Sequence, residues 1–235
     1  MIDLCVVTGA DSSHFGPLRN LLMSLELFEP STRVVVWDLG LTDEERAALE
    51  GRELRRFNFE AYPPHVAMAA RSYAWKPIAV AEVLHELGGG VLWLDAGDLI
   101  HARLHRVRSL LAAEGFWSPA SSGTIYRWTH PQTLAALGAG PELLDRRNRN
   151  GAIVGVTLRA AALVDAWRAA ALDPNVITPP GSSRDNHRQD QAVLSVLAYQ
   201  WQPRLGYALE DSRLEVSVHN DRLSLDEARG VLACR

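Results

Sequence analysis

The chain has 235 residues, of which 47% are hydrophobic and 22% are charged, close to the averages of globular proteins. This length predicts one compact domain, 1–235, with a sizeable core. The net charge of −4, from 24 basic and 28 acidic residues, excludes a globally basic surface of the kind that binds nucleic acid or acidic membranes. Among the 24 basic residues, 23 are arginine and only Lys76 is lysine. Codon bias accounts for the arginines but leaves open why this one lysine is present.

Further classes are excluded by the apolar runs and the cysteines. No run approaches the roughly 18 apolar residues of a transmembrane helix. The first residues include Asp3 and no basic cluster, which predicts a buried strand rather than a signal peptide. Cys5 and Cys234 are too few for a disulfide framework or a zinc site, and a reducing cytoplasm is the expected compartment.

Apolar β-branched runs alternate with helical patterns along the chain, which predicts an α/β fold with a mostly parallel sheet and helices on both faces. The expected elements of the first half are a strand at 4–8, a helix around 18–28, strands at 33–37 and 54–59, a helix that stops at 88–90, and a strand at 91–94. Thr42 and Glu45 have the spacing of a capping box. Pro77 fits the helix before 88–90 only in its first turn, which places Lys76 at the helix N-terminus.

The second half is less regular. Its expected elements are a helix after His105, a strand at 152–156, a helix at 159–172, a polar loop at 179–187, a helix at 189–199 and a strand at 214–218.

Polar residues gather where the predicted strands of the first half end. They are Thr8, Asp11, Asp38, Asp95 and Asp98. Ligands of open parallel sheets bind at the carboxyl edge of the strands. The sequence therefore predicts a site at this edge.

The segment Asp95-Ala96-Gly97-Asp98 follows a buried strand and carries two carboxylates on a tight turn. Carboxylates in this arrangement can hold a hard divalent cation, which in turn neutralises a diphosphate. Gly97 permits a ligand to approach the backbone closely. The alternative is an ordinary turn in which an aspartate caps backbone amides.

Lys76 has two interpretations. An ammonium at the positive end of a helix dipole is unfavourable unless an anion is present, which favours contact with a phosphate. The alternative is a solvated lysine beside Tyr73 and Trp75.

Three positions in the second half are further candidates. Asp190 lies in the first turn of a helix, where it could bind sugar hydroxyls, act as a base or cap the helix. Asn150 and Gly151 supply an amide and a close-approach glycine before a strand, or form an ordinary turn. His219 follows the last strand and could complete a metal site begun by Asp95, although a lone histidine is often structural.

Four short patterns occur together in this chain. They are Tyr-Ala-Trp-Lys-Pro at 73–77, Trp-Leu-Asp-Ala-Gly at 93–97, Asn-Gly-Ala-Ile-Val-Gly at 150–155 and His-Arg-Gln-Asp-Gln at 187–191. Each pattern is weak alone. Their residues, read with Thr8 to Asp11 and His219, resemble in type and order the nucleotide-sugar glycosyltransferases of GT-A fold, in particular family 8. The resemblance is closest to a largely uncharacterised GT-A-like family, and it covers most of the chain.

The resemblance implies a single GT-A domain in which 1–100 form the nucleotide-binding half and 101–235 the half that holds the acceptor and the donor sugar. It implies a donor site made of Thr8, Gly9, Ala10, Asp11, Asp38, Lys76, Asp95, Ala96 and Gly97. It implies that the catalytic residues are Asn150, Asp190 and Gln191. It implies a divalent cation, Mn²⁺ or Mg²⁺, held by Asp95, Asp98 and His219.

The function that follows is transfer of a sugar from a nucleotide-diphosphate sugar, with a UDP-sugar as the expected donor and the acceptor open. One departure from the family pattern is Gly97, which stands where the Asp-x-Asp motif has its second aspartate, with Asp98 shifted by one position. This departure keeps two alternatives open. One is a binding module without catalysis, and the other is a nucleotide-sugar hydrolase or nucleotidyltransferase.

Overall fold

A six-stranded sheet runs through the middle of the computed structural model, which describes residues 2–233, so that Cys234 lies outside it. The strand order is β3-β2-β1-β4-β9-β6. The parallel strands are β1 (Leu4–Ala10), β2 (Arg33–Asp38), β3 (Glu53–Arg56) and β4 (Gly90–Leu94). The antiparallel neighbour of β4 is β9 (Ile153–Val156), and β6 (Phe116–Trp117) pairs antiparallel with β9. The expected mostly parallel sheet is confirmed.

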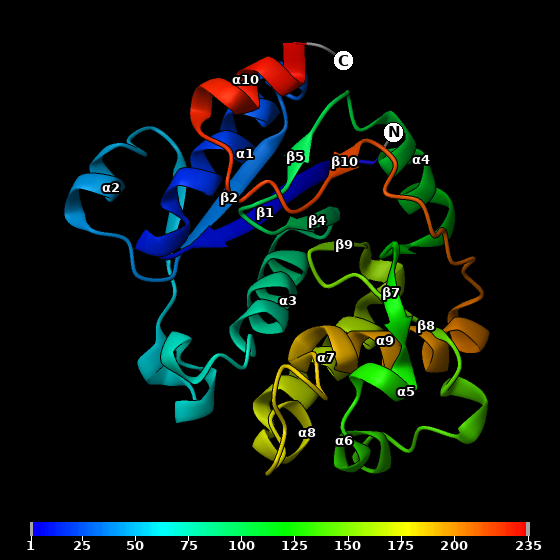
Figure 1. Cartoon of the computed structure of the whole chain (residues 1–235). Coiled ribbons are helices and arrows are strands. Elements are labelled where there is room, and N and C mark those ends of the chain that lie inside the picture. Colours follow the sequence, from blue (N-terminus) through cyan, green and yellow to red (C-terminus); the bar gives the residue numbers. More distant parts are fainter. Residues whose placement is uncertain (1, 234–235) are drawn as a thin grey trace.

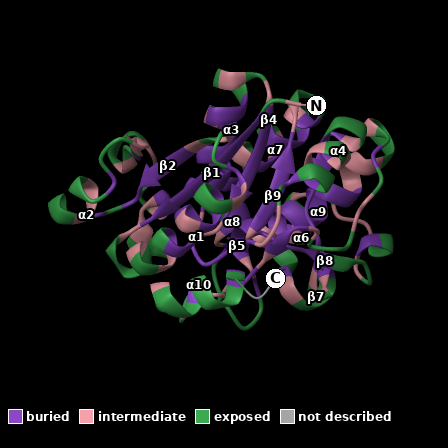
Figure 2. Cartoon of the chain, turned by 90° about the horizontal axis from the view of Figure 1, so that it is seen from above, coloured by how far each residue is buried: buried purple, intermediate pink, exposed green. Residues whose placement is uncertain are grey.

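Helices cover both faces of this sheet (Figure 1). One face carries α3 (Trp75–Leu87), α7 (Ala161–Leu172), α8 (Pro174–Ile177) and α9 (Gln189–Leu205). The other face carries α1 (Phe15–Phe28) and α4 (His105–Glu114), and α10 (Leu225–Ala233) packs on α1. Alternate residues of β1 supply the two cores, since Val7 joins the first and Val6 the second, and both are fully buried. Figure 2 shows this buried sheet beneath helices whose outer faces are exposed.

Local sequence signals account for several element ends. α3 begins at Trp75 and has Pro77 in its first turn, as expected, and it ends at Gly88, whose φ of +68° is the left-handed conformation that glycine adopts readily. The expected capping box is present at α2 (Asp43–Ala47), where the Thr42 hydroxyl accepts from the Glu45 amide.

Two small sheets lie beside the central one and were not expected from the sequence. They are β5 (Leu99–Ile100) with β10 (Val216–Ser217), and β7 (Ala120–Thr124) with β8 (Arg147–Arg149). The remaining helices are α5 (Ile125–Trp128) and α6 (Pro131–Ala136). Short 3₁₀ turns occupy Ser12–His14, Phe59–Ala61, Pro64–Val66, Met68–Ala70, Pro141–Leu143 and Leu158–Ala160. Within 2–233, no helix is both long and apolar enough to cross a membrane.

Two strands are shorter than the sequence predicts. β3 ends at Arg56 rather than at 59, because the rings of Phe57, Phe59 and Tyr62 pack on one another in a turn. The strand expected at 214–218 is reduced to β10, which pairs with β5 outside the central sheet.

Candidate functional site

Lys76 is the centre of a buried polar cluster at the carboxyl edge of the sheet. Its side chain is only 5% exposed, and its Nζ lies 2.8 Å from Asp95 Oδ1 and 3.3 Å from Asp190 Oδ2. Nζ also donates to the Gly151 carbonyl at 3.1 Å. The N-terminus of α3, the end of β4, the turn before β9 and the start of α9 thus converge on one ammonium. The alternative of a solvated lysine is wrong.

The charges in this cluster do not cancel, because one ammonium faces two carboxylates. Burial raises the pKa of Asp190 from 3.8 to about 6; the Lys76 charge opposes this rise and the Asp95 charge adds to it. Burial by itself would lower the pKa of Lys76, but the carboxylates of Asp190 and Asp95 outweigh it and raise that pKa. Lys76 is therefore protonated at neutral pH, while Asp190 changes charge near pH 6.

Asp190 also carries an unused acceptor. Its Oδ2 is buried and accepts no hydrogen bond from the described residues, although it lies near Nζ of Lys76. Gly151 faces this oxygen, and a Cβ atom at that position would lie 3.2 Å from Oδ2 and 3.0 Å from the Cβ of Gln191. The backbone at the glycine expected at 151 therefore does approach Asp190 and Gln191 closely, and a side chain there would crowd both residues.

Asp95 is held from both sides. Trp93 donates its indole N–H to Asp95 Oδ1 at 2.6 Å, and the Asp95 amide donates to the Ala152 carbonyl at 3.0 Å. Its side chain remains 40% exposed, so it can still meet a ligand.

A cavity of about 160 Å³, the strand-end cavity, opens beyond β1 and β4. The predicted donor residues that line it are Gly9, Ala10, Asp11, Lys76, Asp95, Ala96 and Gly97. Seven of the nine predicted donor residues thus face one space.

A second cavity of about 310 Å³, the loop-side cavity, shares Tyr73, Lys76 and Asp95 with the first. It is lined by all three residues predicted to be catalytic, Asn150, Asp190 and Gln191. Within it, the Gln191 side-chain oxygen accepts from the Gly151 amide at 3.3 Å, and the Asn150 side-chain oxygen accepts from the Ala152 amide at 2.8 Å. The two cavities therefore meet at Lys76 and Asp95.

Three predicted site residues line neither cavity. Thr8 is fully buried in β1. Asp38 accepts from the amides of Gly40 and Leu41 and pairs with Arg46 at 3.0 Å, so its charge stabilises the turn after β2. Asp98 is 1% exposed, with a buried oxygen that no described residue contacts through a hydrogen bond.

The structure does not bring the predicted metal ligands together. No group of three or more histidine, cysteine, aspartate or glutamate side chains within 2–233 is close enough to hold a metal ion. His219 is exposed and lines the loop-side cavity with Asp95. Burial, reinforced by the Asp95 charge, raises the pKa of Asp98 well above its ordinary value, which makes it a poor ligand. Asp95, Asp98 and His219 therefore do not fit the cation as a set.

Asp221 is a candidate site residue that the sequence analysis did not single out. It lines the strand-end cavity, and its carboxylate occupies the space that a side chain at Gly97 would need. A Cβ atom at position 97 would lie 2.0 Å from Asp221 Oδ1. The aspartate missing from position 97 is thus matched by a carboxylate from 124 residues further along the chain (221 − 97).

Comparison with known proteins places the fold. A family model described as "Protein of unknown function (DUF1647)" matches residues 2–81, about a third of the chain. A search of curated proteins finds no match. Among solved structures, the galactosyltransferase LgtC in complex with donor and acceptor sugar analogs matches with a TM-score of 0.56 and 15% identity, covering 98% of this chain and 95% of that one. An active-site mutant of LgtC matches with a TM-score of 0.55 and 16% identity over the same shares. The chain has the GT-A fold.

The GT-A fold of this chain carries basic and aromatic side chains on the outer wall of the loop-side cavity. Arg184 and Arg188, from the loop before α9, line this wall with Trp128 of α5. The Arg188 guanidinium carbon lies 4.1 Å from the centre of the Trp128 ring, and Arg184 donates to the Tyr73 hydroxyl at 2.9 Å. No spacing in the sequence indicates this wall, because α5 and the loop are 50 to 60 residues apart.

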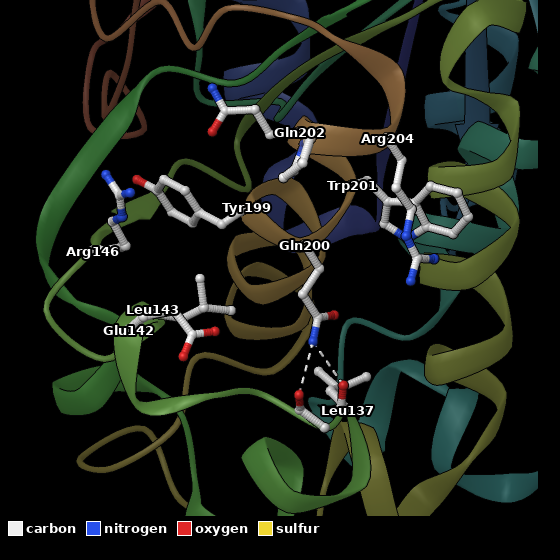
Figure 3. Close-up of a pocket in the computed structure, with 11 residues that line it drawn as sticks. Leu137, Glu142, Leu143, Arg146, Tyr199, Gln200, Trp201, Gln202 and Arg204 are labelled. Atoms are coloured by element: carbon white, nitrogen blue, oxygen red, sulfur yellow. Dashed lines mark hydrogen bonds between the residues drawn. The ribbon is translucent and has the colours of Figure 1, made fainter.

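A larger cavity, of about 650 Å³, lies elsewhere, beside the second half of α9 (Figure 3). Its side chains are largely engaged with one another: Gln200 donates to the Leu137 and Gly138 carbonyls, and Arg204 lies over the Trp201 ring. None of the residues predicted to form a site lines it.

Proposed function

We propose that this protein is a glycosyltransferase that moves a sugar from a nucleotide-diphosphate sugar to an acceptor. The observation that carries the proposal is the meeting of two cavities at Lys76 and Asp95, on the carboxyl edge of a GT-A sheet. In this proposal the strand-end cavity takes the nucleotide and the loop-side cavity takes the sugars, with the charge of Lys76 between them. LgtC, with the same fold, was crystallised with donor and acceptor sugar analogs, which supports this type of ligand.

In this proposal the nucleotide of the donor occupies the strand-end cavity beside Gly9, Ala10 and Asp11. A UDP-sugar is the proposed donor. The 1–100 half then supplies most of the nucleotide site, and 101–235 supplies the sugar site. Lys76 places its ammonium between the cavities, where it opposes the negative charge that develops on a leaving diphosphate. Because burial and two carboxylates fix Lys76 in place, little reorganisation is needed when that charge appears.

Asp190, Gln191 and Asn150 are proposed to hold and orient the sugars in the loop-side cavity. The buried Oδ2 of Asp190, which faces Lys76 Nζ at 3.3 Å and accepts no other bond from the described residues, is the proposed acceptor for a sugar hydroxyl. With a pKa of about 6, Asp190 can also accept a proton near neutral pH, the range in which a general base works well. Orientation of reacting groups in a confined site contributes a large share of catalytic rate.

The residues that the structure describes, 2–233, do not form a three-ligand metal group, so no step of this proposal runs through a cation. Mn²⁺ or Mg²⁺ is kept as the proposed cofactor: Asp95 would be its protein ligand, and the ion would offset negative charge on the donor diphosphate. Its test is the comparison of donor affinity with Mn²⁺, with Mg²⁺ and with EDTA. A reducing cytoplasm is proposed as the compartment on cysteine usage alone.

The proposal is tested first by thermal shift with UDP, GDP and their sugars, and then by release of free nucleoside diphosphate from the sugar that binds best. We expect a nucleotide to raise the melting temperature. We expect Lys76→Arg and Asp95→Asn to reduce turnover at least tenfold, since a planar guanidinium does not replace a buried ammonium. Asp165→Asn, an exposed position on α7, is the control and should leave turnover unchanged.

The outcomes separate the alternatives. Diphosphate release that depends on Lys76 and Asp95 and requires an acceptor supports transfer. Release of a nucleoside monophosphate, or release without any acceptor, indicates a hydrolase or nucleotidyltransferase. Tight binding without turnover, for every acceptor tried, indicates a binding module. If no nucleotide changes the melting temperature, the proposal that the strand-end cavity binds the donor is wrong.

A further inference from the structure

The outer wall of the loop-side cavity presents positive charge that the protein itself does not neutralise. Arg184 and Arg188 line the cavity, and no carboxylate within 2–233 lies at ion-pair distance from either guanidinium. Other arginines of the chain do have a carboxylate partner, such as Arg149 with Asp211 and Arg108 with Glu29. At this wall the guanidinium groups contact aromatic rings instead.

Trp128 brings Arg188 together with a further cation, Arg127, its neighbour in the chain. The guanidinium carbons of Arg127 and Arg188 each lie 4.1 Å from the centre of its ring. Arg184 lies 5.8 Å from the Tyr73 ring centre and donates to the hydroxyl of that residue. Aromatic contacts hold a guanidinium in position and leave its N–H donors free for a ligand.

The electrostatics agree with this geometry. Burial lowers the pKa of Arg188, and the charges of Arg184 and Arg127 lower it further, while Asp185 opposes them. The two carboxylates inside the cavity, Asp95 and Asp190, both lie against the ammonium of Lys76. The outer wall is therefore a concentration of positive charge that an anion would stabilise.

We propose that the acceptor of this site carries a phosphate or carboxylate group, which Arg184 and Arg188 bind beside the Trp128 ring. This inference rests on the proposed function and adds the chemical class of the acceptor. Planar guanidinium groups recognise both oxyanions through paired N–H donors, and the hydroxyls of Ser121 and Ser122 on the same cavity add further donors.

The position of the arginines favours the acceptor over the donor diphosphate. Both line the loop-side cavity only, whereas the proposed nucleotide site is the strand-end cavity. The residues that the two cavities share are Tyr73, Lys76 and Asp95, so the cation placed to meet the diphosphate is Lys76.

The test measures binding of matched sugars to the full chain by calorimetry, in the presence of saturating UDP. Two pairs of probes are compared. The first pair is glucose and glucose 6-phosphate, and the second pair is glucose and glucuronate. We expect each charged sugar to bind at least tenfold more tightly than glucose, and this preference to shrink as salt rises. Arg184→Gln and Arg188→Gln should each weaken binding of the charged sugar about tenfold and leave glucose unchanged.

Arg204→Gln is the matched control, because Arg204 also lies over a tryptophan ring but in the separate cavity beside α9. It should change no affinity. The proposal is overturned if neither pair shows a preference for the charged sugar, whether both members bind or neither does. It is also overturned if the Arg184 and Arg188 variants weaken the binding of UDP itself. That result would assign these arginines to the donor diphosphate. Wild-type protein that binds no nucleotide contradicts the proposed function instead.

Discussion

Replacing Asp190 by asparagine tests the charge imbalance around Lys76. In the folded protein burial raises the pKa of Asp190 from 3.8 to about 6. Between about pH 4 and pH 6, Asp190 is therefore protonated in the folded state and ionised in the unfolded state. Stability therefore falls as pH rises from about 4 through 6, and the cost is fully present above that range. Asparagine is close in size and carries no charge, so Asp190→Asn removes this pH dependence.

The magnitude follows from the two pKa values. The two pKa values differ by about 2. This difference corresponds to about 3 kcal/mol, because a shift of one pKa unit is worth about 1.4 kcal/mol. The free energy of unfolding of Asp190→Asn, relative to wild type, should thus be about 3 kcal/mol more favourable at pH 7.5 than at pH 4. For a chain of this size the relative melting temperature should rise by roughly 6–12 °C between the two pH values.

The assay is urea denaturation of both proteins at several pH values, followed by circular dichroism. Asp226→Asn is the control for loss of an aspartate, since that side chain is 93% exposed. A relative stability of Asp190→Asn that stays constant within 1 kcal/mol from pH 4 to 7.5 would refute the reasoning. A change in the opposite direction would mean that Lys76 stabilises the Asp190 carboxylate more than burial disfavours it.

Three further predictions concern the same site. Lys76→Met leaves the buried carboxylate of Asp190 without its cation and should lower the free energy of unfolding by about 3–5 kcal/mol in urea denaturation; a loss below 1 kcal/mol contradicts the buried ion pair. Gly97→Ala forces the Asp221 carboxylate to move and should weaken nucleotide binding in thermal shift, whereas the same change in an Asp221→Ala background should cost nothing further. Gly151→Ala should lower stability by roughly 1–3 kcal/mol and reduce turnover, because its Cβ would press on Gln191 and Asp190; unchanged turnover would show that the close approach is not needed.

Elements with a strong local signal were predicted well from the sequence. The alternation of apolar runs and helical patterns predicted a mostly parallel sheet with helices on both faces, and the structure has this sheet. The patterns at 73–77 and 93–97 contain Lys76 and Asp95, which the structure brings together at the carboxyl edge of the sheet. The capping box at Thr42 and the helix start at Lys76 rest on contacts within one turn, so local sequence was sufficient.

Features that depend on distant segments were missed or misplaced. The strand expected at 214–218 is not part of the central sheet, because β10 pairs with β5 rather than with a strand of that sheet. Asp38 looked like a ligand residue at a strand end, but its charge is used by Arg46 and two amides of the following turn. Asp98 has the spacing of a metal ligand, yet its side chain is buried away from both cavities.

By itself, the sequence determined the type of fold, and it singled out one sheet edge and one lysine as candidates for a site. Only the tertiary structure decided what that lysine does, because its partners Asp95 and Asp190 lie 19 and 114 residues away along the chain (95 − 76 and 190 − 76). The same holds for the Asp221 carboxylate against Gly97 and for the arginine wall around Trp128. The charge of each group and its exposure to a ligand depend on burial and on neighbours from other segments of the chain. The spacing of residues along the sequence does not indicate either property.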